Sequence, residues 1–215
     1  MPEFMTARFT RDFEPGAHEH NWSGADRQPL TLVGGESECR AEVHLLWSDT
    51  GLYIRFDCED ARLSCSGLPD FADLYTEDAV ELFLQPDSAL PLYFEYELSP
   101  LGAELPLLVC NNGVSYYGWL PFQYRGARNT RRHTRVLGGG MAPFSACTGW
   151  VAEAYIPFAL LEGLPCVPPK AGDRWQANFC RIDHDRSGEP ARWAWEPAAG
   201  TEFHDFGKFG EIVFE

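Results

Sequence analysis

The amino-acid sequence predicts an all-β protein: a two-layer antiparallel β-sandwich of the jelly-roll type with minimal helix. Apolar and polar residues alternate through most segments, and a period of two is the pattern of a strand with one buried face. Clusters of Gly, Pro and Asn separate these segments, as turns do between short strands. The helical signal is confined to PFALLEG at residues 157–163, where Pro157 suits a first turn and Gly163 a helix end. About nine short strands with so little helix are typical of a sandwich or a barrel.

A first hairpin is predicted in EVHLLWSDTGLYIRFD, residues 42–57. Val43, Leu45 and Trp47 share one face of the first strand, and the apolar alternation resumes after the turn residues Asp49, Thr50 and Gly51. One side of this hairpin therefore faces the core.

A second hairpin is predicted from two strands at 80–84 and 92–98, joined by a Pro-containing turn. Alternate side chains of a strand point to opposite faces of the sheet. Since the apolar residues of both strands face the core, Glu81, Glu95 and Glu97 are expected on a common face directed away from it.

The remaining strands complete a single domain over residues 1–215. They are predicted at 106–110, 115–119, 130–137, 150–156, 175–182 and 209–214. Residues 1–4 are left out of the prediction, since a second methionine at position 5 is compatible with a cloning remnant in front of it.

The charge balance bears on the partners. The formal net charge is -15 and the sequence pI is about 4.7, which opposes binding to nucleic acid. No apolar run reaches the roughly 18–20 residues of a membrane span, and the first residues lack a secretory leader pattern. The protein is therefore expected either to be cytoplasmic or to have a leader that this sequence omits, and the oligomeric state is left open.

The seven cysteines form no C-x-x-C pair, so the sequence contains neither a zinc-ribbon nor a thioredoxin-like motif. Most of them lie among apolar residues, where a free thiol behaves as a small hydrophobe. Reduced thiols are expected.

Three roles are open for the outward-facing glutamates. Acids on a strand face are most often a solvated surface. A pair such as Glu81 with Glu95 or Glu97 could instead serve as general acid and base in a glycan hydrolase. The third role is a polar platform that accepts hydrogen bonds from sugar hydroxyls without any proton transfer.

Acidic residues near turns also suggest a calcium site, because calcium prefers hard oxygen ligands. The candidate ligands are Asp60, Glu77 and Asp78. The EF-hand spacing is absent, and a solvated acidic edge is the alternative.

Two aromatic rings are predicted to be exposed. Tyr75 and Phe203 each lie in a polar, turn-rich stretch just before a strand. Exposed rings can stack on the flat apolar faces of a ligand.

Six motifs in series resemble the family 9-like carbohydrate-binding modules of the DOMON-like β-sandwich group. They run from about residue 40 to the C-terminus: VHLLWSDTGLYIRFDCED, YTEDAVELFLQPD, YFEYELSPLG, GWVAEAYIPFALL, GDRWQANFCRID and FHDFGKFGEIVF. The resemblance implies a sandwich that binds an oligosaccharide or polysaccharide without transforming it, often as an accessory to glycan-degrading enzymes, often with calcium and usually after export.

The resemblance also implies a set of site residues. The family's founding members clamp a terminal sugar between two exposed tryptophans, whose positions match Tyr75 and Phe203 here. The sugar-contacting glutamate of the family matches Glu81, and the position of its arginine on the neighbouring strand matches Glu95.

Asn178 and Arg181 complete the predicted ligand-binding set as possible partners of sugar hydroxyls. They are three residues apart, so a regular strand cannot place both on the Glu81 face. Arg181 could equally pair with an acid at the edge of the core. A haem or redox-cofactor binder of the DOMON type is a third functional alternative, weakened by the absence of a strand-borne Met and His ligand pair.

Overall fold

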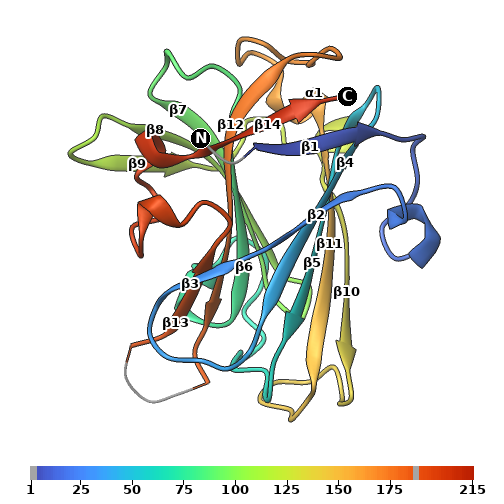
Figure 1. Ribbon diagram of the computed structural model, residues 1–215, viewed down its shortest axis with the longest axis vertical. Helices are drawn as coiled ribbons and strands as arrows, with labels where there is room; N and C mark the ends of the chain where they lie inside the picture. The colour runs from blue at the N-terminus through green and yellow to red at the C-terminus, as the bar shows by residue number, and fades with distance from the viewer. Residues whose placement is uncertain (1–3, 186–188) are drawn as a thin grey trace.

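The structure is a computed structural model that describes residues 4–185 and 189–215. It is almost entirely β, which confirms the predicted fold class (Figure 1). The first sheet contains, in spatial order, β9 (Tyr116–Trp119), β8 (Glu104–Asn111), β7 (Leu92–Leu98), β6 (Ala79–Gln85), β12 (Arg174–Asp183) and β14 (Gly210–Phe214). β13 (Ala191–Ala194) and β3 (Thr31–Gly34) extend this sheet beside the other end of β12.

The second sheet packs against the first. It contains β10 (Arg131–Leu137), β11 (Gly149–Pro157), β5 (Gly51–Glu59), β4 (Ala41–Trp47) and, along part of β4, β2 (Asp26–Pro29). The predicted first hairpin is β4 and β5, whose strands pair from Ala41 opposite Cys58 to Trp47 opposite Leu52.

β1 (Phe4–Phe9) joins the two sheets at one end of the sandwich. Its first residues pair in parallel with β14, and Arg8 and Phe9 pair in parallel with β4. Figure 1 shows β1 beside β14 at the top of the molecule and the β2–β3 segment crossing in front of the sandwich. Phe4 therefore belongs to the fold, and its exclusion from the prediction was wrong.

Helix is limited to short segments. The predicted helix is α1 (Phe158–Leu161), which follows Pro157. The described residues also form the 3-10 helices η1 (Glu19–Trp22), η2 (Leu74–Thr76), η3 (Gly126–Arg128), η4 (Pro197–Ala199) and η5 (Phe206–Lys208). No helix among the described residues is long and apolar enough to cross a membrane.

Four strands were missed by the sequence prediction: β1, β2, β3 and β13. β2 and β3 read DRQP and TLVG, and most of their side chains are half-buried or exposed. Neither segment has an alternating apolar face, so their pairing depends on neighbours distant in the chain.

The main core lies between the two sheets. The inward residues of the second hairpin, Val80, Leu82 and Leu84, pack there with large rings that include Trp150 and Trp175. The seven cysteines are free thiols, as expected.

A second apolar layer covers the opposite face of the first sheet. Phe83 and Tyr93 on that face pack with Phe203 and Phe209, which come from the segment between β13 and β14. The Phe83 and Phe209 ring centroids are 5.7 Å apart. This segment turns an outer sheet face, which the sequence alone would leave open to water, into a partly enclosed site.

Candidate functional site

A cavity of about 320 Å³ lies on the outer face of the first sheet. Its apolar wall is formed by side chains of β8 and β12, among them Leu105, Leu107 and Ile182. Gly118 on β9 lies close to Leu107 at the edge of the cavity. A Cβ at this position would be 3.1 Å from Leu107 Cδ1, so a larger residue would crowd this edge.

Three glutamates form the polar floor of the cavity. Glu81 on β6 lies directly opposite Glu97 on β7, and Glu95 is two residues before Glu97 on the same strand. The prediction that these side chains share the face opposite the main core is confirmed by this register. The expectation of a solvated surface is wrong, because Glu81 and Glu95 are only 4% exposed and Glu97 only 1%.

Burial and mutual repulsion raise the pKa of all three carboxyl groups. Burial is the larger cause for each of them. The charge of Glu95 further raises the pKa of Glu81, and Glu97 does the same for Glu95. Burial and Glu81 bring the pKa of Glu97 to about 9, although a hydrogen bond from the backbone N–H of Tyr75 opposes the shift. At neutral pH this floor holds protons that ordinary glutamates would lose.

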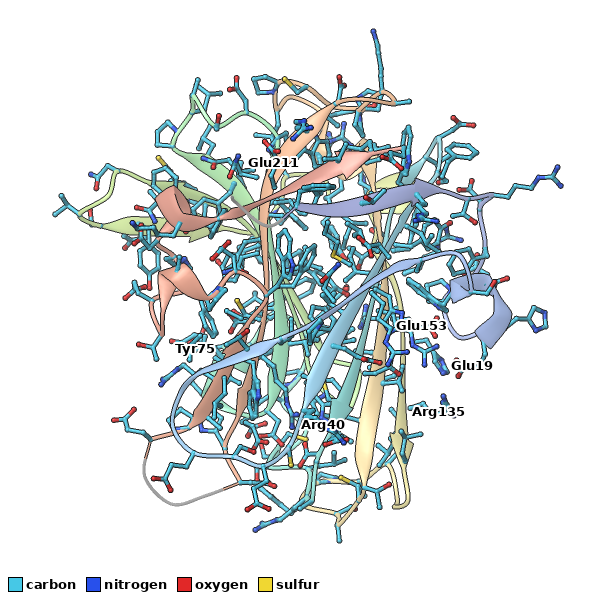
Figure 2. All side chains as sticks on the ribbon, viewed as in Figure 1. Glu19, Arg40, Tyr75, Arg135, Glu153 and Glu211 are labelled. Carbon is cyan, nitrogen blue, oxygen red and sulfur yellow. The ribbon has the colours of Figure 1, made fainter. Side chains whose placement is uncertain are left out.

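Tyr75 and Tyr116 supply the exposed rings of the cavity. Tyr75 lies within η2, and its backbone N–H donates to Glu97 Oε2 over 2.8 Å, which ties this segment to the floor of the cavity. The Tyr75 ring is 50% exposed, which confirms its predicted exposure. Tyr116, on the edge strand β9, is 49% exposed. Figure 2 shows Tyr75 on one side of the molecule, with Glu19, Arg135 and Glu153 on the other.

His204 supports the Tyr116 ring. The two rings stack with centroids 3.8 Å apart and an interplanar angle of 15°. His204 Nδ1 is 2.7 Å from the Tyr93 hydroxyl, which fixes the orientation of the imidazole. Burial lowers the pKa of His204 to about 4, so its contact of 3.9 Å with Glu95 is not an ion pair at neutral pH.

The predicted exposure of Phe203 is wrong. Its ring is 5% exposed and packs in the apolar layer with Phe83 and Phe209. Phe203 still lines the cavity, but it cannot present a free face beside Tyr75. The ring that does so is Tyr116, which lies 87 positions earlier in the chain, in the predicted strand at 115–119.

Asn178 and Arg181 lie outside the cavity. Asn178 is on the Glu81 face, opposite Phe83, but it is buried and exchanges hydrogen bonds with the backbone of Glu196 at 3.0 and 3.3 Å. Arg181 is on the other face, opposite Val80. The structure therefore does not bring either side chain to the candidate ligand site.

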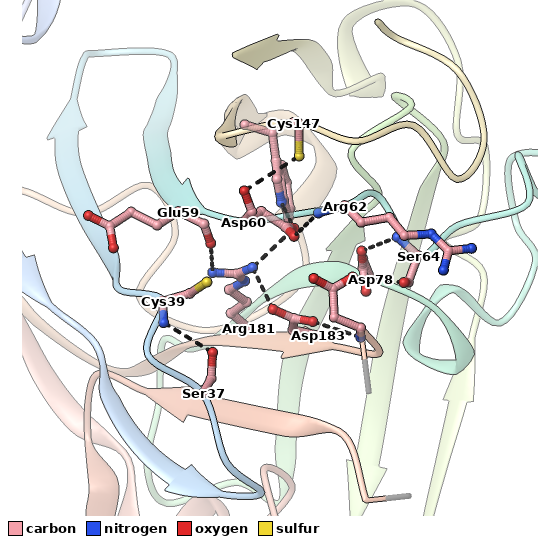
Figure 3. A network of polar contacts seen from close by, with 12 residues as sticks. Ser37, Cys39, Glu59, Asp60, Arg62, Ser64, Asp78, Cys147, Arg181 and Asp183 are labelled. Atoms are coloured by element: carbon pink, nitrogen blue, oxygen red, sulfur yellow. Dashed lines mark hydrogen bonds and ion pairs between the residues drawn. The ribbon is translucent and has the colours of Figure 1, made fainter. Parts of the chain in front are cut away.

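Arg181 is instead the centre of a buried polar network at one end of the sandwich (Figure 3). It is fully buried and lies 3.1 Å from Asp60 Oδ2 and 2.9 Å from Asp183 Oδ2. Its Nη1 donates to the backbone oxygen of Glu59, and its guanidinium lies over the Trp193 ring. The alternative of an acid at the edge of the core as its partner is confirmed.

A carboxylate cluster adjoins this arginine. Ligand oxygens of Asp60, Asp78 and Asp185 lie within 4.8 Å of one another. Burial is the main cause that raises the pKa of both Asp60 and Asp78 to about 7, although Arg181 lowers that of Asp60. Glu77, the third predicted calcium ligand, is not a member of this cluster; its carboxylate accepts a hydrogen bond from the Ser66 N–H.

Comparisons with known proteins agree with this architecture. Residues 16–101 match the family described as "Carbohydrate family 9 binding domain-like". A crystal structure of a candidate carbohydrate-binding protein from Bacteroides uniformis is similar over 100% of both chains, with a TM-score of 0.79 and 19% identity. No curated protein matches the chain.

Two further structures show a family 9 carbohydrate-binding module from Caldicellulosiruptor kristjanssonii. The complex with cellotriose has a TM-score of 0.71 and 16% identity over 99% of this chain and 94% of that one. The complex with glucose has a TM-score of 0.68 and 17% identity over 99% of this chain and 96% of that one. The resemblance found in the sequence is confirmed: residues 16–101 carry the pattern of the family 9-like carbohydrate-binding domains, and the chain as a whole has their fold.

Proposed function

We propose that this protein binds carbohydrate, without catalysis, in the cavity over Glu81, Glu95 and Glu97. The observation that supports this most directly is the combination of two half-exposed rings, Tyr75 and Tyr116, with a buried polar floor. A pyranose has C–H groups on its faces and hydroxyls around its rim, so rings and carboxyl groups suit it.

The size of the cavity is consistent with one sugar unit and part of a second. A volume of about 320 Å³ is at the lower end of the range for small-ligand sites. Related folds hold glucose and cellotriose in family 9 modules. We therefore propose a mono- or oligosaccharide ligand and a role associated with glycan degradation.

Binding fits the carboxyl arrangement better than hydrolysis does. Glu81 and Glu97 are neighbours on one sheet face, whereas a hydrolase needs two carboxyls that flank the scissile bond from different sides. A haem role has no support in the cavity either, since Met5 is in the core and Met141 is on an exposed loop.

Calorimetry with glucose and short oligosaccharides tests the proposal. Tyr75→Ala and Tyr116→Ala are each expected to weaken binding tenfold or more, because each removes a ring face. Tyr117→Ala is the matched control, since Tyr117 is 74% exposed on the same strand but points to the opposite face. Equal losses in all three variants, or no binding by the unaltered protein at millimolar sugar, would refute the proposal.

The resemblance implies bound calcium, and we propose that Asp60, Asp78 and Asp185 hold it. Their oxygens are hard ligands close enough to share one ion. Asp78 already accepts the N–H groups of Ser64 and His184, which fixes its orientation and leaves lone pairs free. A bound cation would offset the cost of burying these acids and tie the chain near residue 185 to the sandwich.

A further inference from the structure

The cavity contains far more acidic groups than basic ones. Its acidic residues are Asp73, Glu81, Glu95, Glu97 and Glu202, and its single arginine is Arg192. Arg192 is also within 3.6 Å of Glu189. The neutral His204 adds no charge. A ligand in this cavity therefore meets a strong excess of carboxyl groups.

Glu81 has no direct hydrogen-bond or salt-bridge partner among the described residues, and burial and Glu95 raise its pKa against the smaller opposing effect of the charge of Arg192. Among residues 4–185 and 189–215, no hydrogen bond or ion pair reaches its carboxyl group, although the side chain is more than nine-tenths buried and lines the cavity. Buried polar groups in folded proteins nearly always have a partner. An unpartnered acid directed into a ligand cavity thus indicates a donor on the ligand.

The groups of described residues with the spacing of a metal site lie outside this cavity. Within the described part of the chain, two groups have ligand atoms close enough to hold a metal: Glu42 with His44 and Asp57, and the aspartate cluster near Arg181. The cavity glutamates are not among them. A primary ammonium group is a cation with three N–H donors, so it can donate to more than one of these carboxyl groups at once.

We propose that the cavity prefers an amino sugar, with the protonated primary amine over the carboxyl groups of Glu81, Glu95 and Glu97 and the pyranose ring between Tyr75 and Tyr116. The inference depends on the proposed function and adds the charge class of the ligand. A neutral sugar offers hydroxyls to this floor, whereas an ammonium also offsets the repulsion between its acids.

The preference should depend on pH, because the ammonium favours the deprotonated acids. The groups that face Glu81 and can titrate or carry charge come from several elements: Asp73 and Tyr75 near η2, Glu95 and Glu97 on β7, Tyr116 on β9, Arg192 on β13, and Glu202 and His204 before η5. Binding of the cation is expected to release protons from the floor, and binding of a neutral sugar is not.

Three monosaccharides that differ at one substituent test the inference: glucosamine, glucose and N-acetylglucosamine. Calorimetry at pH 7 is expected to give glucosamine an affinity at least tenfold above the other two. The advantage should shrink toward pH 5. Titrations in buffers of different ionisation enthalpy should show proton release for glucosamine alone.

Variants test whether the glutamate floor of the cavity is the source of the preference for glucosamine. Glu81→Gln keeps the shape of the side chain and is expected to reduce the glucosamine advantage at least fivefold while glucose still binds. Asp49→Asn makes the same change of charge on the exposed β4–β5 turn and should leave the advantage intact. A thermal melt of each variant confirms that it is folded.

The outcomes separate the two proposals. Glucose binding with an affinity equal to or above that of glucosamine overturns the amino-sugar inference and leaves carbohydrate binding standing. A glucosamine advantage that survives Glu81→Gln and Glu97→Gln also overturns it, since the floor is then not its source. Failure of all three sugars to bind contradicts both.

Discussion

Glu81 on β6 and Glu97 on β7 lie directly opposite each other, and both carboxyl groups are buried on the same sheet face. Opposed residues of antiparallel strands have Cβ atoms about 4.5–5.5 Å apart. Two negative charges at about 5 Å repel by roughly 3 kcal/mol at an effective dielectric constant of about 20. The pair therefore keeps at least one proton well above the ordinary pKa of a glutamate.

This pair should make the protein less stable as the pH rises. The pKa of Glu97 is about 9 in the folded state, against 4.5 for an ordinary glutamate. Between these values the folded state holds a proton that the unfolded chain has lost, so the free energy of unfolding falls with pH. One such proton gives a slope of up to about 1.4 kcal/mol per pH unit. Urea unfolding at several pH values from 5 to 9 measures this slope of the free energy of unfolding against pH.

Glu97→Gln removes this titration while keeping an oxygen that can accept the Tyr75 N–H. The variant is expected to be more stable than the unaltered protein at pH 8, by at least about 1 kcal/mol, and to show a flatter pH profile. Asp49→Asn on the exposed turn should leave the profile unchanged. A Glu97→Gln profile as steep as that of the unaltered protein would show that the acid is ionised in the folded state.

Two arginines that contact Glu59 should differ sharply in their contribution to stability. Arg181→Met leaves Asp60 and Asp183 buried without their cation and is expected to cost about 3–5 kcal/mol. Arg40 forms an exposed pair with the Glu59 carboxylate, with side chains 84% and 48% exposed, so Arg40→Met should leave the free energy of unfolding almost unchanged. Chemical unfolding of both variants checks the contrast, which equal losses would contradict. Figure 2 marks the position of Arg40.

Calcium should raise the melting temperature through the aspartate cluster. A ligand at 100 times its dissociation constant adds about 2.7 kcal/mol to the free energy of unfolding when it binds the folded state alone. The shift should disappear on chelation and in Asp185→Asn. It should persist in Glu77→Gln, because Glu77 bonds to Ser66 outside the cluster. Loss of the shift in Glu77→Gln alone, or no shift in the unaltered protein, would refute the assignment.

His204 should remain neutral down to a pH of about 4, because burial disfavours its charged form. Ring-proton chemical shifts measured by NMR from pH 3 to 8 report this directly. Between about pH 4 and 6.5, His204 is protonated in the unfolded chain but neutral in the folded protein. This group by itself therefore lowers the free energy of unfolding as the pH falls. A titration near 6.5 would place the imidazole in water and remove the support for Tyr116.

His204→Ala tests whether the support of the Tyr116 ring by His204 contributes to ligand binding. The imidazole stacks on Tyr116 at 3.8 Å, so its loss should free the Tyr116 ring and weaken sugar binding severalfold while Tyr75 remains in place. Calorimetry compares this variant with Tyr117→Ala. No change in affinity would indicate that Tyr116 is held by β9 alone.

The alternation of apolar and polar residues was enough to predict the sandwich, its two hairpins and the common face of Glu81, Glu95 and Glu97. A strand has a period of two, so one buried face dictates where the other residues point. The exposure of Tyr75 followed from its local context, just before such a strand. These features depend on neighbours in the chain.

Tertiary structure decided the rest of the site. The segment between β13 and β14 folds over the outer face, buries Phe203, places His204 beneath Tyr116 and encloses the glutamates. Likewise, Asp185 rather than Glu77 joins Asp60 and Asp78 because three distant segments meet at one end of the sandwich. Periodicity fixes the direction of a side chain from its own strand, but burial depends on what another part of the chain places above it.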